Sequence, residues 1–265
     1  MSGARTTMLA TLRGRIAVHE AYGGAERPER VALGHAEADA SLQGGLIRGA
    51  LHEVFAAEGR HCTAATGFVA GLAGRIGRRR PLLWIRHDLS ALEAGALSLS
   101  GWAELGLDPR LVVTVRAATP DVALRVAADA LACDALGVVV LDIWGEARPF
   151  DLVASRKLTL AAQASGVTGL MLRAAAMPQP STAETRWIVR AARSPPGPLW
   201  CGWGTPLFDA ELVRNRHGPV GRFLMEWKSD ECVFAQPLRA AADSQPVAAA
   251  AGDRPHPASA RLRAG

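Results

Sequence analysis

Lysine is almost absent from this chain, in which arginine supplies nearly all of the positive charge. Among 30 lysine and arginine residues, only Lys157 and Lys228 are lysines. A phosphate-binding loop of the form G-x-x-x-x-G-K-[ST] requires a lysine, because its ammonium and the backbone N–H groups together surround the β and γ phosphates. The chain instead reads A-A-E-G-R-H-C-T-A-A-T-G-F at 56–68, between an expected strand and an expected helix. We therefore expect neither a bound nucleotide cofactor nor ATP hydrolysis.

Metal-binding spacings are missing as well. The four cysteines stand singly and form no C-x-x-C: Cys62, Cys133, Cys201 and Cys232. This spacing predicts neither a disulfide framework nor a zinc site. The seven histidines show no H-E-x-x-H and no other paired spacing, so we expect no bound metal.

Long apolar runs are also missing. No segment approaches the ~20 apolar residues that a membrane helix needs. The N-terminus M-S-G-A-R-T-T-M-L-A lacks the uninterrupted apolar stretch and cleavage site of a signal peptide. These absences predict a cytoplasmic protein without membrane contact. The formal net charge of +5 permits contact with nucleic acid without requiring it.

Strand and helix patterns alternate through the middle of the chain. Strands without polar alternation are expected at 49–55, 81–86, 111–115, 137–142 and 169–173. Helices are expected between them at 63–78, 90–105, 120–133 and 150–165, after an extended lead-in over 25–48. Buried strands separated by helices are typical of a parallel sheet covered on both faces. The sequence therefore predicts an α/β three-layer sandwich.

The pattern changes in the last third of the chain. Polar and apolar residues alternate at 186–192, 207–214, 221–227 and 231–235, which predicts an antiparallel extension of the same sheet. The expected domain division is an N-terminal amphipathic helix within 1–24, a core over 25–235, and a disordered tail over 236–265. The tail is assigned because those residues include no aromatic side chain and cannot bury enough apolar surface to become ordered.

Several motifs occur in the order found in RecA/DnaB-type ATPase cores. These are D-x-x-L-x-G-G-L-x-x-G at 39–49, V-V-V-L-D at 138–142 and N-R-H-G-P-V-G-R-F at 215–223. Together with the degenerate P-loop and P-S-T-A-E-T-R-W at 180–187, they make the chain resemble the ImuA family, the RecA-like accessory proteins of bacterial mutagenic translesion-synthesis cassettes. The resemblance covers about residues 36–228. It implies a RecA-like sandwich with a mostly parallel central sheet and an antiparallel C-terminal extension.

The resemblance places a degenerate nucleotide site near Gly59, Thr63, Asp88 and Asp142. Asp142 stands where a Walker B aspartate would hold Mg²⁺ through water; the alternative is a carboxylate that caps the strand end. Asp88 stands where related enzymes carry a water-activating glutamate, and the alternative is a helix N-terminal charge. Without a phosphate cradle, neither carboxylate would have a bound substrate to act on. The resemblance therefore implies a protein that is not an enzyme.

A late hairpin keeps its polar and charged residues, although the phosphate-binding residues of the degenerate loop are lost. In RecA-type oligomers, cations at this position reach the nucleotide of a neighbouring subunit. The resemblance therefore implies that Arg214, Asn215 and Arg216 form an interface with a partner, while the alternative is a solvated turn held by Gly218 and Pro219. Two further loops carry the DNA contacts of RecA-type filaments, and here they are short. Among the residues in or beside them, only Trp144, Arg148, Arg173 and Arg186 could contact phosphate or stack on bases. We therefore expect DNA contact to be weak.

The family resemblance also implies partners. They are an ImuB-like relative of Y-family polymerases, an error-prone C-family DNA polymerase and RecA, within the SOS-induced response to DNA damage. We expect an accessory or scaffold protein that acts through these protein contacts. The alternatives are a divergent RecA-type ATPase and a direct DNA-binding protein.

Overall fold

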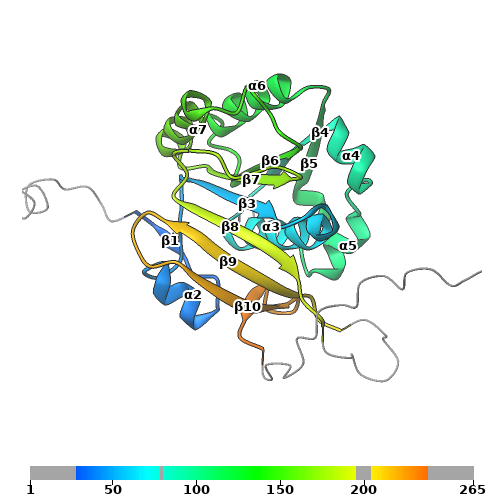
Figure 1. The fold of residues 1–265 in the computed structure, drawn as a ribbon, viewed down its shortest axis with the longest axis vertical. Coiled ribbons are helices and arrows are strands. Elements are labelled where there is room, and N and C mark those ends of the chain that lie inside the picture. The colour runs from blue at the N-terminus through cyan, green and yellow to red at the C-terminus, as the bar shows by residue number, and fades with distance from the viewer. Residues whose placement is uncertain (1–27, 78–79, 195–203, 238–265) are drawn as a thin grey trace, which may run out of the picture.

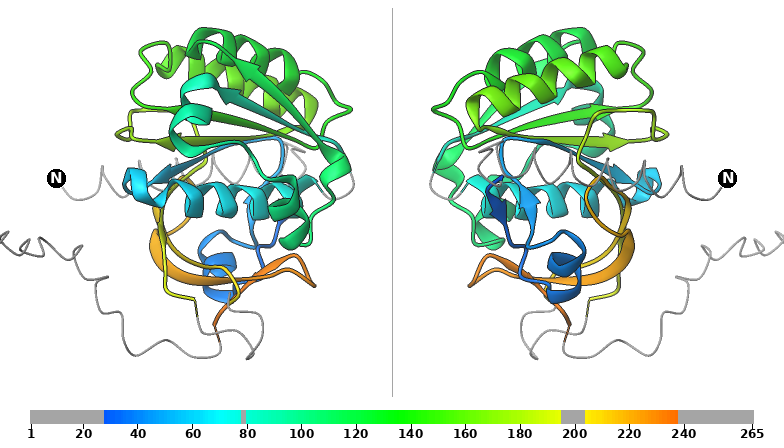
Figure 2. Two further views of the ribbon diagram at one scale, coloured as in Figure 1. Left: turned by 90° about the vertical axis from the view of Figure 1, so that its right-hand side faces the viewer. Right: turned by 90° about the vertical axis from the view of Figure 1, so that its left-hand side faces the viewer.

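A nine-stranded mixed sheet forms the centre of the molecule, with the strand order β11-β10-β9-β8-β3-β7-β6-β4-β5 (Figure 1). The computed structural model describes residues 28–77, 80–194 and 204–237. Helices lie on both faces of the sheet (Figure 2). The predicted α/β fold, a RecA-like three-layer sandwich, is therefore confirmed.

The parallel part of the sheet consists of the five strands that the sequence predicts without polar alternation, together with β8, which it predicts as antiparallel. They are β3 (Leu51–Ala56), β4 (Leu82–His87), β5 (Val112–Ala117), β6 (Val138–Trp144), β7 (Thr168–Ala174) and β8 (Thr185–Ala191). Every residue of β3 and β7 is buried. Burial on both faces explains why β3 and β7 lack polar alternation. Their carboxyl ends share one edge of the sheet, where the candidate site lies.

Helix α3 (Cys62–Gly77) packs on one face and is enclosed by the antiparallel end of the sheet, which curves around it (Figure 2). The Phe68 ring lies 5.7 Å from the Trp187 ring and 5.0 Å from the Phe234 ring, measured between centroids. Gly71 permits this packing, because a Cβ at that position would lie 2.7 Å from the Phe234 ring and 2.9 Å from the Trp227 ring. Aromatic side chains thus fix α3 against the sheet.

Helices α6 (Pro120–Leu131) and α7 (Leu152–Ser165) cover the opposite face. Both begin at a side chain that accepts a hydrogen bond from the first turn: Thr119 caps α6, and the Asp151 carboxylate accepts from the Ala154 N–H at 2.7 Å. Such caps satisfy N–H groups that have no partner within the helix. Helix α7 ends at Gly166, whose φ of +75° is left-handed.

The antiparallel extension contains β9 (Leu207–Asn215), β10 (Gly221–Lys228) and β11 (Val233–Ala235). The edge strand β11 is covered in turn, because the Phe234 N–H donates to the Leu33 carbonyl at 3.0 Å. Two short strands, β1 (Arg30–Val31) and β2 (Leu46–Ile47), pair beside this end of the molecule.

Three sequence predictions were wrong in detail. The lead-in is not wholly extended, since it contains α2 (Ala36–Ser41), which begins at His35 with the ring Nδ1 accepting from the Ala38 N–H. The helix predicted at 90–105 is two helices, α4 (Asp88–Ala94) and α5 (Leu99–Glu104), because Gly95 adopts a φ of +74°. Strand β8 pairs in parallel with β3, so the antiparallel part begins at β9.

Two predicted segments fall largely outside the described residues. The amphipathic helix expected within 1–24 lies outside them, as does the tail from residue 238 onward. The domain boundaries at both ends therefore stay predictions. Among the residues that are described, no helix has both the length and the apolar character needed to cross a membrane.

Candidate functional site

The loop between β3 and α3, at the position of a P-loop, is short and closed on itself. It forms one 3-10 turn, η1 (Gly59–His61), in which the His61 N–H donates to the Glu58 carbonyl at 2.9 Å. Arg60 pairs with Glu58 of the same loop, at 3.0 Å between Nη2 and Oε1. The His61 ring accepts from the Ala191 N–H at 3.1 Å. Such a loop has no lysine with which to hold phosphates.

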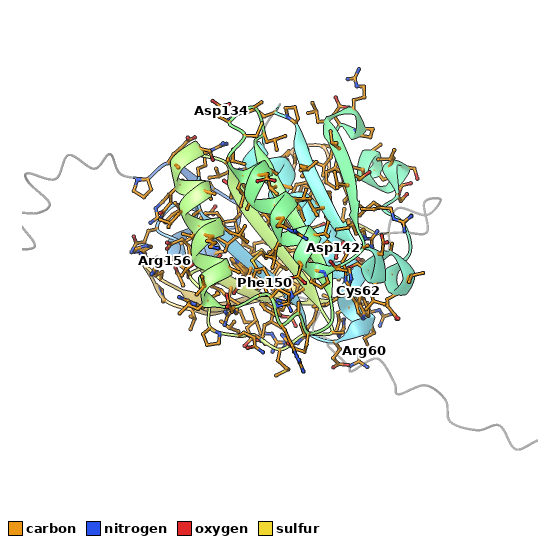
Figure 3. The ribbon with its side chains drawn as sticks, turned by 90° about the horizontal axis from the view of Figure 1, so that it is seen from above. Arg60, Cys62, Asp134, Asp142, Phe150 and Arg156 are labelled. Atoms are coloured by element: carbon orange, nitrogen blue, oxygen red, sulfur yellow. The ribbon has the colours of Figure 1, made fainter. Side chains whose placement is uncertain are left out.

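The hydroxyl groups at the start of α3 do not replace the missing cradle. Thr63 is exposed, and the Thr66 hydroxyl donates to the Cys62 carbonyl at 2.9 Å. Figure 3 labels Arg60 and Cys62 beside the start of α3, and Asp142 at the end of β6. A cavity of about 220 Å³ lies beside these turns, lined by Thr63, Thr66, Arg86 and mostly apolar residues of α3, α5 and the α4–α5 link. That volume is below the usual range of small-molecule sites.

Asp142 is engaged by the protein itself. Its carboxylate lies 3.0 Å from Nε of Arg86 and accepts from the Trp84 indole N–H at 3.3 Å. The side chains of Arg86 and Asp142 are only 8% and 6% exposed. The two residues are direct neighbours across the parallel strands β4 and β6. The guanidinium thus lies against the Asp142 carboxylate from the neighbouring strand.

Burial dominates the electrostatics of this pair. It raises the pKa of the Asp142 carboxyl above its ordinary value, because removing the charge from water outweighs the opposing contribution of the Arg86 guanidinium. Arg86 is fixed in turn, since its Nη2 donates to the Ser90 carbonyl at 3.2 Å. A carboxylate held in this way is a structural partner of arginine and is poorly suited to bind hydrated Mg²⁺.

Sequence reasoning identified Asp142 but missed Arg86. The signal was an arginine at the end of the apolar segment P-L-L-W-I-R, at 81–86. A charged residue that ends a buried strand needs an opposite charge nearby. The sequence does not give the register between β4 and β6, so it could not identify Asp142 as that charge.

Asp88 lies on the other side of β4. It is the first residue of α4, and its Oδ1 lies 2.9 Å from Nε of Arg116 on β5. The structure therefore places Asp88 at a helix N-terminus, which was the alternative interpretation of the sequence. Its partner belongs to β5, whereas the partner of Asp142 belongs to β4.

The late hairpin is tied to its own protein. Arg214 Nη1 donates to the Ser181 carbonyl at 2.7 Å, and the Asn215 side chain donates to the Ser41 carbonyl at 2.8 Å. Arg216 pairs with the buried carboxylate of Glu184 at 3.1 Å and keeps 48% of its side chain exposed. Docking through these residues stays a prediction. Within the chain, they anchor the hairpin to the segment before β8 and to the residue that ends α2.

The arginines beside the two short loops make internal contacts: Arg173 is buried and Arg186 is partly buried. Arg173 is 3% exposed, donates to the Gly145 carbonyl at 3.1 Å and lies over the Phe150 ring at 5.2 Å. Burial lowers its pKa below the usual value. Arg186 pairs with the Glu53 carboxylate at 2.6 Å. The expectation that these two residues are candidates for phosphate contact was wrong, because both guanidinium groups bind partners within the protein. Of the three arginines, only Arg148 is exposed.

Within the described ranges, no group of three or more histidine, cysteine, aspartate or glutamate side chains is arranged to hold a metal ion. No protein-family model matches the chain. Two similar proteins, both named Protein ImuA, come from two strains of Caulobacter vibrioides. The chain is 30% identical to each over 199 residues, which cover 69% of this chain and 77% of each relative.

Proposed function

The chain belongs to the ImuA family, as a distant member, and on this premise we propose that it is a non-catalytic accessory protein in damage-induced translesion DNA synthesis. One observation carries the non-catalytic part. The carboxylate at the Walker B position is neutralised from within by Arg86. The loop opposite it is closed by its own turn and ion pair. Both changes remove groups that phosphoryl transfer requires.

The accessory role follows from the family. We propose that the protein joins an ImuB-like relative of Y-family polymerases and an error-prone C-family polymerase, and that RecA is a further partner. The fold supports a scaffold, because the RecA-like sandwich is retained while the nucleotide-binding groups are not. The two alternative functions are less well supported. An ATPase would need a free Asp142, and DNA contact through the two short loops would have only Arg148 exposed to make it.

Removal of both charges of the Arg86–Asp142 pair tests this proposal. The double variant Arg86→Met/Asp142→Leu replaces the buried ion pair with apolar side chains, which is often neutral for stability. We expect it to restore damage-induced mutation to the wild-type level in cells lacking the gene. A divergent ATPase would lose that activity. Calorimetry with ATP and Mg²⁺ is the matching measurement: micromolar binding, together with hydrolysis that the double variant abolishes, would contradict a non-catalytic role.

A further inference from the structure

A long groove runs between α6 and α7, on the face of the sheet away from α3. It encloses about 690 Å³. Its apolar lining comes from both helices and from the loop before α7: Leu124, Ala128, Pro149, Val153, Ala154 and Leu158. Charged side chains complete the lining, namely Asp121, Arg125, Asp151 and Lys157.

The surface of α7 beside this groove is unusually apolar. Leu152, Val153 and Leu160 expose 53%, 62% and 53% of their surface. At helical spacing, residues 153 and 160 are two turns apart on one side of the helix. Three large exposed aliphatic side chains on one helix, beside an apolar groove, are typical of a surface that binds a partner.

The cations around the groove have no internal partner. Across the described parts of the chain, six lysine or arginine side chains make no hydrogen bond or ion pair: Arg80, Arg125, Arg148, Arg156, Lys157 and Arg193. Four of these six belong to α6, α7 or the loop that leads into α7. Figure 3 shows Arg156 on α7, at the periphery of the molecule. Unpaired cations are thus concentrated where the apolar side chains are exposed.

We propose that the α6–α7 groove binds an acidic amphipathic helix of a partner protein. An amphipathic helix places apolar side chains at three- and four-residue spacing into a groove of this kind. Carboxylates on its flank would meet Arg125 and Lys157, which lie on the two opposite helices of the groove. The chain supplies the cations, and charge complementarity therefore assigns the acidic residues to the partner.

The lining argues against a nucleic acid as the occupant. It contains no aromatic side chain on which a base could stack. Two carboxylates, Asp121 and Asp151, lie at the start of α6 and α7 and would repel a phosphate backbone at that end. They also set the polarity of the partner, whose acidic residues must lie over Arg125 and Lys157 and away from Asp121 and Asp151.

Peptide selection with the full chain tests this inference independently of the proposed role in translesion synthesis. A displayed library of random 16-residue peptides is selected on the wild-type protein. We expect enrichment of peptides with acidic residues on one side of an apolar helical stripe. Arg125→Glu/Lys157→Glu should weaken their binding by more than about tenfold. The matched control, Arg80→Glu/Arg193→Glu, reverses two cations that are equally exposed and unpaired but lie elsewhere, and should bind as the wild type does.

A second variant separates the apolar contribution from the charges. Val153→Gln/Leu160→Gln keeps every charge and should also weaken binding, because it removes the side chains that the peptide would bury. The inference is overturned if no acidic helical peptide is enriched, or if enriched peptides bind the groove and control variants equally. It is also overturned if a short DNA duplex, rather than peptide, loses affinity in the groove variant alone, since that result would assign the face to nucleic acid.

Discussion

The carboxyl edge of the sheet on the α3 side differs from the α6–α7 surface in whether its charged side chains are paired within the protein. At the first, the buried carboxylate of Asp142 is paired with the buried guanidinium of Arg86. At the second, Arg125 and Lys157 have no partner within the described chain. Buried charges require partners inside the protein, because an isolated buried charge is very costly. Exposed cations have no such requirement and remain free to bind another molecule.

This difference directs the search for a binding surface away from the nucleotide site. An inherited nucleotide site would normally be the first place to look for function in a RecA-like sandwich. Here the Asp142 carboxylate at that position is paired with Arg86. The unpaired cations lie on the opposite face of the sheet.

The largest effect is expected on breaking the buried pair from one side. Arg86→Met leaves the Asp142 carboxylate buried without its guanidinium, and removal of one partner from a buried pair typically costs about 3–5 kcal/mol. We expect a loss of this size in the free energy of unfolding, measured by urea denaturation. The Arg86→Met/Asp142→Leu variant should recover most of it. A single variant within about 1 kcal/mol of wild type would mean that water reaches Asp142.

A smaller loss is expected at the hairpin. Arg214→Ala/Arg216→Ala removes one hydrogen bond to the Ser181 carbonyl and one charged contact to the buried Glu184. Together we expect a loss of about 1–3 kcal/mol, to which the half-exposed Arg216 contributes less because solvent screens it. Arg222→Ala, which removes a surface ion pair on β10, is the control and should have little effect. If both variants have the wild-type midpoint, the hairpin arginines are solvated.

The pH dependence of stability probes another buried group. His52 is fully buried between the Ile47 carbonyl and the Thr185 hydroxyl, and desolvation lowers its pKa. At low pH the unfolded chain therefore takes up a proton that the folded chain does not. Stability from this group is present above about pH 6.5 and is lost as the pH falls below it. Urea denaturation from about pH 7.5 to 5.5 should show this decline, and His52→Gln should flatten it. An equal slope in both proteins would assign the decline to other groups.

The architecture was largely readable from the sequence, for a physical reason. Strands β3, β6 and β7 are buried on both faces, so their segments are mostly apolar and show no regular polar alternation. The single helix expected over 90–105 failed at Gly95, whose left-handed backbone breaks an otherwise helical pattern. Helix α2 was missed because its cap is a histidine ring, outside the usual set of N-cap residues.

The candidate site was less predictable, because its chemistry depends on register and on side-chain direction. The sequence located Asp142 and the degenerate loop, but the partner that neutralises Asp142 comes from a strand more than 50 residues away. The position of Arg173 over the Phe150 ring depends on how the loop before α7 packs on the sheet. Which cations remain unpaired is likewise a property of the assembled surface, so composition alone gave no indication of the α6–α7 groove.

The smallest effect is expected on the face with unpaired cations, and it is the other half of the comparison. Arg125→Glu/Lys157→Glu reverses two charges that make no contact to be lost. Exposed substitutions of this kind usually change stability by less than about 0.5 kcal/mol. The variant should therefore unfold at the wild-type urea midpoint, even though it loses acidic peptides. A loss above about 1 kcal/mol would show that these side chains stabilise the fold. In that case Arg125 and Lys157 would stabilise the fold as Arg86 does, and they would not be free to bind a partner at the groove.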